Sequence, residues 1–331
     1  MRLGTQALTP AAEEIASQAG VLGSFAEGAQ RVLRKMSGLR LSESTVERTT
    51  EAAGQRVAAQ WEAGRSLGPT APWAWQKDAM GRRCAYVSLD ATGVRQQGPG
   101  GSRVDGKMAY VAMVYNARSE HDAMRPPPRQ VRYLSGFLDF QTLGRQLHRE
   151  ALKVGWAEAD QQIALSDGGN GLEDFFRTYF PKAECILDFW HAKEYLVELG
   201  KALYPQDDIA RQRWTDDACH RLKHEGGPIV RRWLETLDFN LASAELRETH
   251  RRTTQYFRNH EHRMDYPRYV RNGWQIGSGP VESACKTVVG NRLKGGGMRW
   301  GQAGADAVCH LRALYLSEPA CWESFWNPPP N

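Results

Sequence analysis

The feature that most constrains the fold is a change of pattern inside residues 82–204, where strand signals first occur alone and then alternate with helix signals. Three strand-like runs follow one another without an intervening helix, which predicts an antiparallel meander. These runs are residues 83–89, 108–115 and 131–134. Two later runs, 162–166 and 185–187, alternate with helical patterns, so we expect parallel strands joined by helical crossovers. This order predicts an α/β fold with a ribonuclease-H-like mixed sheet flanked by helices.

The sequence on either side of this core is predicted to be helical. A first helix begins at Pro10 within a helical region, because proline is favoured in a first turn. A later helix restarts at Ser42 or Ser44, and Glu47 would complete a capping box with Ser44. This helix follows another near Phe25 to Met36, after a break at Gly38, and it could be the reading helix of a DNA-binding helix-turn-helix. The alternative is a helical hairpin that packs on the next domain.

We therefore divide the chain into six segments. Residues 206–265 mix arginine with acids and contain no convincing strand, so we expect an all-α insertion before the last helix of the core. The segments are 1–64, an N-terminal helical region; 65–81, a linker; 82–204, the first part of the core; 205–270, the helical insertion; 271–318, the final helical part of the core; and 319–331, a tail.

Composition narrows the class of protein. The chain has 331 residues, of which 41% are hydrophobic, and a formal net charge of +5, which is ordinary for a soluble globular protein and permits a polyanionic partner. We find no apolar stretch long enough to span a bilayer and no signal-peptide pattern, so we expect no membrane association and a cytoplasmic location. None of the six cysteines forms a Cys-x-x-Cys pair, which argues against a zinc ribbon.

Three acidic residues occur at positions from which their carboxylates could converge on one point. Asp90 follows the first strand-like run, and Asp167 follows the run 162–166. Glu282 lies in the first turn of a helix that opens with Gly279 as N-cap and Pro280 as first helical residue. Such carboxylates can hold two divalent metal ions such as Mg²⁺, an arrangement suited to cutting and joining phosphodiester bonds. Each acid alone could instead be a turn or helix-dipole residue.

Two further groups of residues are candidates for a catalytic or nucleic-acid-binding role. Asp188 and His191 lie after the run 185–187, where Asp188 could also cap the next helix and His191 could contact phosphate or bond to Asp188. The clearest basic segment lies near the C-terminus, and we expect it to contact DNA, with a tryptophan stacking on a base. Its candidate residues are Lys286, Arg292, Lys294, Arg299 and Trp300. The alternative is a solvated loop with Trp300 in the core.

Long motifs in this chain resemble those of ISKra-type bacterial insertion-sequence transposases. They are NGWQIGSGPVESACK at 272–286, RLKGGGMRW at 292–300 and ILDFWHAKE at 186–194, and the resemblance extends from about Leu8 to Leu316. By this resemblance the fold is ribonuclease-H-like, and Asp90, Asp167 and Glu282 match the acidic DDE triad. Asp188 with His191 looks like the Asp-x-x-His motif of Mutator-like transposases.

The resemblance implies an enzyme that binds the terminal inverted repeats of an insertion sequence and target DNA, uses magnesium or manganese, and acts as a homo-oligomer associated with the nucleoid. Met1 lies close to the first shared segment, so we expect an N-terminally truncated copy or a misplaced start. Two alternatives remain: a non-catalytic DNA-binding remnant of a transposase, and a metal-dependent nuclease without strand transfer.

Overall fold

The computed structural model describes residues 8–117, 130–239 and 243–327. The chain divides into two compact units, each assembled from separate stretches of sequence. Unit 1 comprises Met1–Ala74, Leu89–Glu158 and Val281–Asn331. Unit 2 comprises Trp75–Ser88 and Ala159–Pro280. Strand β1 and helix α11 each begin in unit 2 and end in unit 1, so these two elements carry the chain from one unit to the other.

A five-stranded mixed sheet has the order β3-β2-β1-β4-β5. The strands are β1 (Cys84–Val94), β2 (Lys107–Tyr115), β3 (Val131–Gly136), β4 (Gln161–Ser166) and β5 (Glu184–Leu187). Strands β2 and β3 are antiparallel, whereas β4 is parallel to both β1 and β5. A mixed α/β fold of this kind was predicted, and it is confirmed. Strand β1 is buried from Cys84 to Leu89 and β4 from Ile163 to Ser166, because helices cover the sheet and exclude water from valine, leucine and isoleucine side chains.

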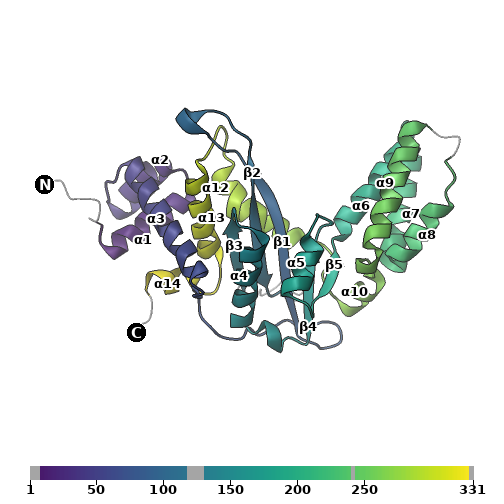
Figure 1. Cartoon of the computed structure of the whole chain (residues 1–331), viewed down its shortest axis with the longest axis horizontal. Coiled ribbons are helices and arrows are strands. Elements are labelled where there is room, and N and C mark those ends of the chain that lie inside the picture. Colours follow the sequence, from purple (N-terminus) through teal and green to yellow (C-terminus); the bar gives the residue numbers. More distant parts are fainter. Residues whose placement is uncertain (1–7, 118–129, 240–242, 328–331) are drawn as a thin grey trace. The chain divides into compact units, whose positions relative to one another are not determined.

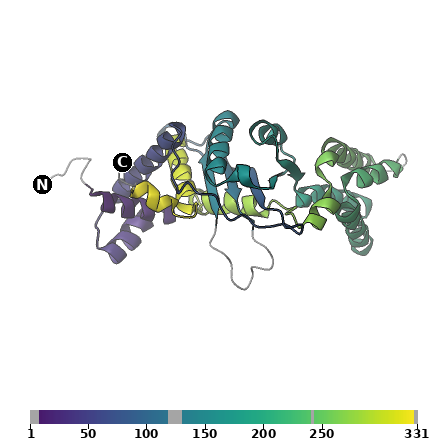
Figure 2. The ribbon, with the colours of Figure 1, turned by 90° about the horizontal axis from the view of Figure 1, so that it is seen from below.

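The helices of unit 1 pack around α13 (Figures 1 and 2). Helix α3 lies against α13 so closely that a side chain on Gly54 would meet the carbonyl oxygen of Ala307 at 2.0 Å. Helix α13 also covers β3, where the N–H of Phe137 donates to Asp306 Oδ1 at 2.7 Å. The elements are α1 (Pro10–Leu22), α2 (Phe25–Glu27), a π-helical segment (Gly28–Ser37), α3 (Glu43–Glu62), a 3₁₀ turn (Pro99–Gly101), α4 (Phe140–Lys153), a 3₁₀ turn (Trp156–Glu158), α11 (Gly279–Ala284), a π-helical turn (Cys285–Gly290), α12 (Asn291–Leu293), α13 (Gln302–Leu316) and α14 (Cys321–Trp326).

Unit 2 contains a helical bundle in which α6 packs on α7 and α9, and α8 packs on α7 and α9 (Figures 1 and 2). The stacked rings of Tyr195 and Tyr256, with centroids 3.8 Å apart, join α6 to α9. The helices are α5 (Leu172–Tyr179), α6 (Phe189–Leu203), α7 (Asp208–Glu225), α8 (Gly227–Thr236), α9 (Ala244–His260), a 3₁₀ turn (Glu261–Arg263) and α10 (Tyr266–Asn272). The described part of the predicted insertion is therefore helical, as expected.

Three local predictions need correction. Ser42, not Ser44, caps α3, because its hydroxyl accepts from the N–H of Thr45, and no capping box with Glu47 forms. Gly279 is the first residue of α11 rather than its cap. The predicted tail 319–331 contains α14, whose Cys321 and Trp322 are buried; residues 328–331 lie outside the described residues.

Among the described residues, no helix combines the length and apolar character needed to cross a bilayer.

Candidate functional site

Asp90 does not end its strand, as the sequence suggested. Strand β1 continues to Val94, and Asp90 lies at the point where burial changes along it. Residues from Cys84 to Leu89 are all buried, whereas Asp90 and the next two residues are only partly buried. The prediction failed because Thr92 and Val94 extend the strand pattern past the acid. Asp90 therefore lies on a paired strand, a more rigid position than the end of a loop.

Within unit 1, Asp90 is close to the helical turn that follows Glu282. The thiol of Cys285 donates to Asp90 Oδ2 at 3.4 Å. Burial raises the pKa of Cys285 strongly, and the negative charges of Asp90 and Glu282 raise it further. This thiol therefore stays protonated at neutral pH and acts as a hydrogen-bond donor, which leaves it unsuited to be a nucleophile. Asp90 accepts a hydrogen bond from this sulfur, and Glu282 precedes Cys285 by three residues in the chain.

Glu282 lies in the first turn of α11, as predicted, and its side chain is exposed. The helix continues past Ala284 as a π-helical turn, Cys285–Gly290, which contains Lys286. Turns of this width are rare and are frequent at functional sites. The first turn of a helix favours an ionised carboxylate, so Glu282 is suited to present negative charge.

Asp167 occupies a tight turn in unit 2, directly after β4. Its Oδ1 accepts from the N–H of Gly169 at 2.8 Å. The guanidinium of Arg263, only 2% exposed, donates from Nη2 to Ser166 Oγ at 3.0 Å and to the backbone carbonyl of Asp167 at 3.4 Å. A Cβ on Gly168 would lie 2.8 Å from the phenolic oxygen of Tyr256, so a larger residue there would require the Tyr256 ring to shift. The loop that carries the Asp167 carboxylate is therefore held by hydrogen bonds from Arg263 and by the close approach of Tyr256.

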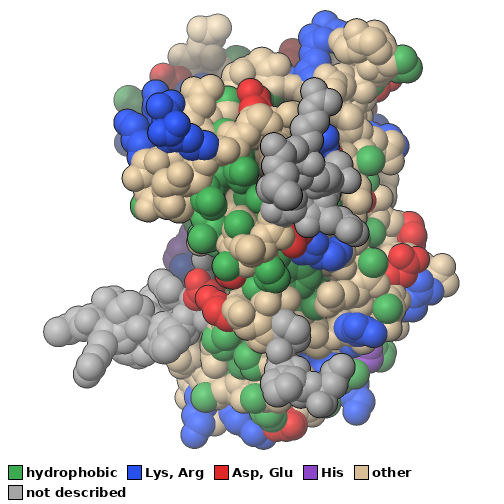
Figure 3. Space-filling model, turned by 90° about the vertical axis from the view of Figure 1, so that its left-hand side faces the viewer, with side chains coloured by type: hydrophobic (Ala, Val, Ile, Leu, Met, Phe, Trp, Pro, Cys, Tyr) green, Lys and Arg blue, Asp and Glu red, His purple; other side chains and the backbone are tan. Residues whose placement is uncertain are grey.

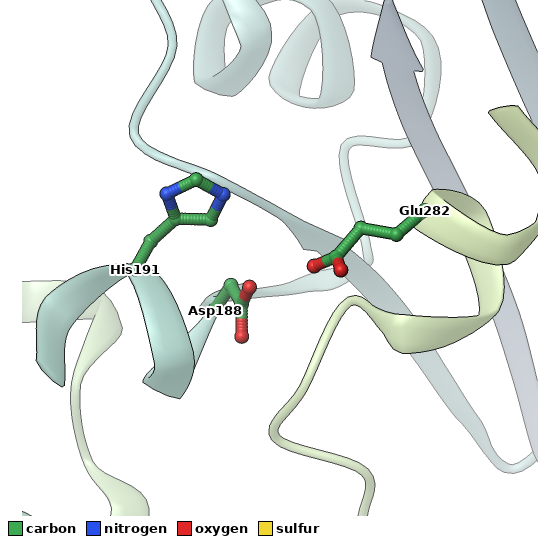
Figure 4. Close-up of side chains that lie close together, drawn as sticks. All are labelled: Asp188, His191 and Glu282. Carbon is green, nitrogen blue, oxygen red and sulfur yellow. The ribbon is translucent and has the colours of Figure 1, made fainter. Parts of the chain in front are cut away.

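Asp188 and His191 stand at the start of α6 (Figure 4). Asp188 is fully buried and caps the helix: Oδ1 accepts from the N–H of Trp190 at 2.9 Å, and Oδ2 accepts from the hydroxyl of Ser278 at 2.6 Å. The capping alternative raised by the sequence is therefore confirmed. His191 is half-buried, with Nδ1 3.5 Å from the carboxylate of Glu194, so the imidazole has an acidic neighbour on its own helix.

Asp188 and His191 lie in unit 2, whereas Glu282 lies in unit 1, and each of these side chains can offer one ligand atom (Figure 4). The sequence identified all three residues; Ser278, which donates to Asp188, was missed.

The predicted basic segment divides into buried and exposed members. Lys286, Lys294 and Arg299 are exposed. Arg292 is 2% exposed, donates from Nε to the carbonyl of Gly20 at 2.8 Å, and stacks on Phe25 and Trp300. Burial lowers the pKa of Arg292 to about 10.

Trp300 is also buried, and its Nε1–H donates to the carbonyl of Leu293 at 3.1 Å. The predicted DNA contacts of Arg292 and Trp300 are therefore inconsistent with this structure. The sequence favoured surface positions because RLKGGGMRW reads as a glycine-rich basic loop, whereas cation–π stacking holds both side chains in the core of unit 1.

A scan against protein-family models finds no match for this chain, and a search of curated proteins finds none either.

Proposed function

We propose that this protein is a DDE transposase with a ribonuclease-H-like core, which cuts DNA at the ends of an insertion sequence and joins it to a target in a metal-dependent reaction. The sheet order is the observation that carries the proposal. Two antiparallel strands stand on one side of β1, and two parallel strands, β4 and β5, stand on the other. This is the strand order expected of a ribonuclease-H-like core.

The register of the sheet supports pairing of the two aspartates. Strands β1 and β4 are parallel, with Ser88 opposite Leu165. If this register continued for two more residues, Asp90 would lie opposite Asp167 on the neighbouring strand, and neighbouring strands are about 4.8 Å apart in a sheet. Side chains at equivalent positions of parallel neighbours point to the same face. Two carboxylates so arranged suit shared divalent cations, because each would otherwise repel the other.

Glu282, on α11, would complete the set, as the resemblance to ISKra-type transposases implies. Carboxylate oxygens suit Mg²⁺ or Mn²⁺, and such ions, when bound, activate a water or hydroxyl nucleophile and stabilise the leaving oxygen. Each of the three acids lies on an ordered element. Asp90 lies on a paired strand, Asp167 lies in a loop held by hydrogen bonds, and Glu282 lies in the first turn of a helix. His191 would contribute an imidazole that can contact a phosphate.

The test uses end-labelled duplex DNA that carries the terminal inverted repeat, an unlabelled target plasmid, and Mg²⁺ or Mn²⁺. We expect the wild-type chain to release the 3′ end and join it to the plasmid. Asp90→Asn, Asp167→Asn and Glu282→Gln should each lower the cleavage rate at least ~100-fold, because each removes metal-dependent stabilisation worth several kcal/mol. Asp174→Asn, which changes an exposed aspartate of α5, is the matched control and should cut normally.

Three other outcomes would replace the proposal. Cleavage without joining identifies a metal-dependent nuclease. DNA binding with no cleavage in either metal identifies a non-catalytic remnant that occupies element ends. Wild-type activity in all three acid variants would show that these carboxylates are not the catalytic set.

A further inference from the structure

A polar pocket of about 370 Å³ in unit 1 is lined by three arginines and has no part in the acidic site described above. Arg95 follows the end of β1, Arg103 lies in the connection from β1 to β2, and Arg299 lies between α12 and α13 (Figure 1). All three side chains are exposed. One acid, Asp105, shares the lining, so guanidinium groups outnumber carboxylates by three to one.

Backbone hydrogen bonds hold the three arginines together. The N–H of Trp300 donates to the carbonyl of Arg95 at 3.1 Å, and the N–H of Gln97 donates to the carbonyl of Trp300 at 2.9 Å. Gln97 also forms an antiparallel bridge with Arg103. Buried Trp300 thus anchors Arg299 beside Arg95, while the bridge brings Arg103 to the same place. The pocket is built by paired backbone, so its shape does not depend on flexible side chains alone.

The charge of the pocket indicates an anionic ligand. Within the described residues, none of Arg95, Arg103 and Arg299 is within ion-pair distance of a carboxylate. Guanidinium groups that outnumber the carboxylates beside them repel one another, and a bound anion would relieve this repulsion. Their planar forks match phosphate oxygens through pairs of parallel hydrogen bonds.

The surroundings favour a phosphate that belongs to a long polyanion. Lys294 donates to the hydroxyl of Thr92 at 2.8 Å, and this threonine lies on β1 between Asp90 and the pocket. Lys107, at the start of β2, donates to Gln302 at 2.6 Å. Exposed positive charge therefore occurs along the strand as well as in the pocket. On the face of the molecule in Figure 3, lysine and arginine side chains lie in several separate groups, as suits contacts at individual phosphates.

We propose that Arg95, Arg103 and Arg299 form a binding site for one backbone phosphate of the DNA substrate. The identity of the ligand as DNA rests on the proposed function. Arg95 lies five residues beyond Asp90 along the strand direction, which corresponds to roughly 17 Å at about 3.3 Å per residue. One DNA strand rises about 3.4 Å per nucleotide, so the contacted phosphate would lie within about five nucleotides of the cut.

The first experiment measures binding of element-end duplex without metal, as a function of salt concentration, so that it is independent of catalysis. Arg103→Gln and Arg299→Gln should each weaken binding and lower the slope of log K against log[salt] by about 0.9, the effect of losing one phosphate contact. Arg145→Gln, on α4, removes an equal charge from an exposed position of unit 1 outside the pocket and should leave the slope unchanged. Equal slopes in all three variants would overturn the proposal.

The second experiment locates the phosphate by ethylation interference. In the wild-type complex, ethylation of one phosphate within about five nucleotides of the cut should block binding, whereas Arg103→Gln should be indifferent to that same modification. An unchanged interference pattern in Arg103→Gln contradicts the proposal. Circular dichroism melting of each variant verifies that it is folded, and Arg103→Lys, which keeps the charge but loses the fork, should bind at an intermediate level.

Two further measurements distinguish a DNA phosphate from a free anion as the ligand, and DNA binding from DNA cleavage. Titration with inorganic phosphate by calorimetry tests a free-anion site: loss of phosphate binding in Arg103→Gln with unchanged DNA affinity would assign the pocket to a small anion and overturn the DNA contact. The cleavage assay is scored separately. If the wild-type chain binds DNA with the predicted interference but never cuts it, the transposase proposal fails and the phosphate site stands.

Discussion

The buried residue Asp188 shows how hydrogen bonds accommodate an acidic side chain in the interior of this protein. Its carboxylate is buried, yet both oxygens accept hydrogen bonds, one from a backbone N–H and one from Ser278. An acid that is fully removed from water needs such partners, because an unpaired buried charge is strongly destabilising. The sequence allowed both capping and a chemical role for Asp188. Capping is now confirmed, while a contribution of this carboxylate to chemistry stays a prediction.

Ser278→Ala is the residue-scale test of this bond. The substitution leaves Asp188 Oδ2 without its hydroxyl donor, and hydrogen bonds to charged groups contribute about 1.5–3 kcal/mol, so we expect the free energy of unfolding to fall by that amount. Urea denaturation followed by circular dichroism measures it. Ser283→Ala, at an exposed position of α11, should change stability by less than about 0.5 kcal/mol. Equal stability of the two variants would show that the Ser278 bond contributes nothing.

Most helices and strands were predictable because the sequence patterns that define them are local. Strands β4 and β5 differ from prediction by one residue at their starts, since an apolar run and flanking turn residues define each of them. Arg292 and Trp300 were misjudged because their environment comes from Phe25 and Gly20, more than 250 residues away in the chain.

The close approach of α3 and α13 gives an element-scale prediction. Gly54→Ala would improve helix propensity by about 1 kcal/mol, but its methyl group would lie 2.0 Å from the carbonyl oxygen of Ala307, on a backbone that cannot move aside easily. We expect the helices to separate and the free energy of unfolding to fall by about 1–3 kcal/mol.

Gly301→Ala is the matched control for this substitution. A Cβ at Gly301 meets nothing within 4 Å, and the backbone there has a φ of −64°, which alanine adopts readily. Thermal melting of both variants decides the question: a Gly54→Ala protein as stable as Gly301→Ala would show that the two helices have room to adjust.

At the scale of the whole molecule, pH dependence follows from acids held by hydrogen bonds. Burial alone would raise the pKa of Asp306, but bonding to His310, the charge of that imidazole and the N–H of Phe137 together lower it below its usual 3.8. A depressed pKa means that the folded state binds fewer protons than the unfolded chain. The stabilisation is therefore fully present above pH 3.8 and is lost as the pH falls through the lower, folded-state value.

Asp306→Asn should remove this pH-dependent contribution. We expect the variant to be less stable than wild type by about 1 kcal/mol at pH 6, since it loses a charged acceptor, and the difference should shrink as the pH falls below about 4. Unfolding free energies of both proteins between pH 6 and pH 2.5 test this. A difference that stays constant over that range would exclude Asp306 as a source of acid sensitivity. The exposed-site variant Asp174→Asn should keep the wild-type profile.

The wide turn at Cys285–Gly290 has one last consequence, for insertions and deletions. An α-helix advances about 100° per residue, and a π-helical turn accommodates one residue more than an α-helical turn of the same height. Deleting a single residue there would give a regular helix, with every hydrogen bond made, yet would swing Glu282 about 100° around the axis relative to α13. Such a variant should fold well, and under the proposed function it should fail to cut DNA, because the Glu282 carboxylate would point in another direction.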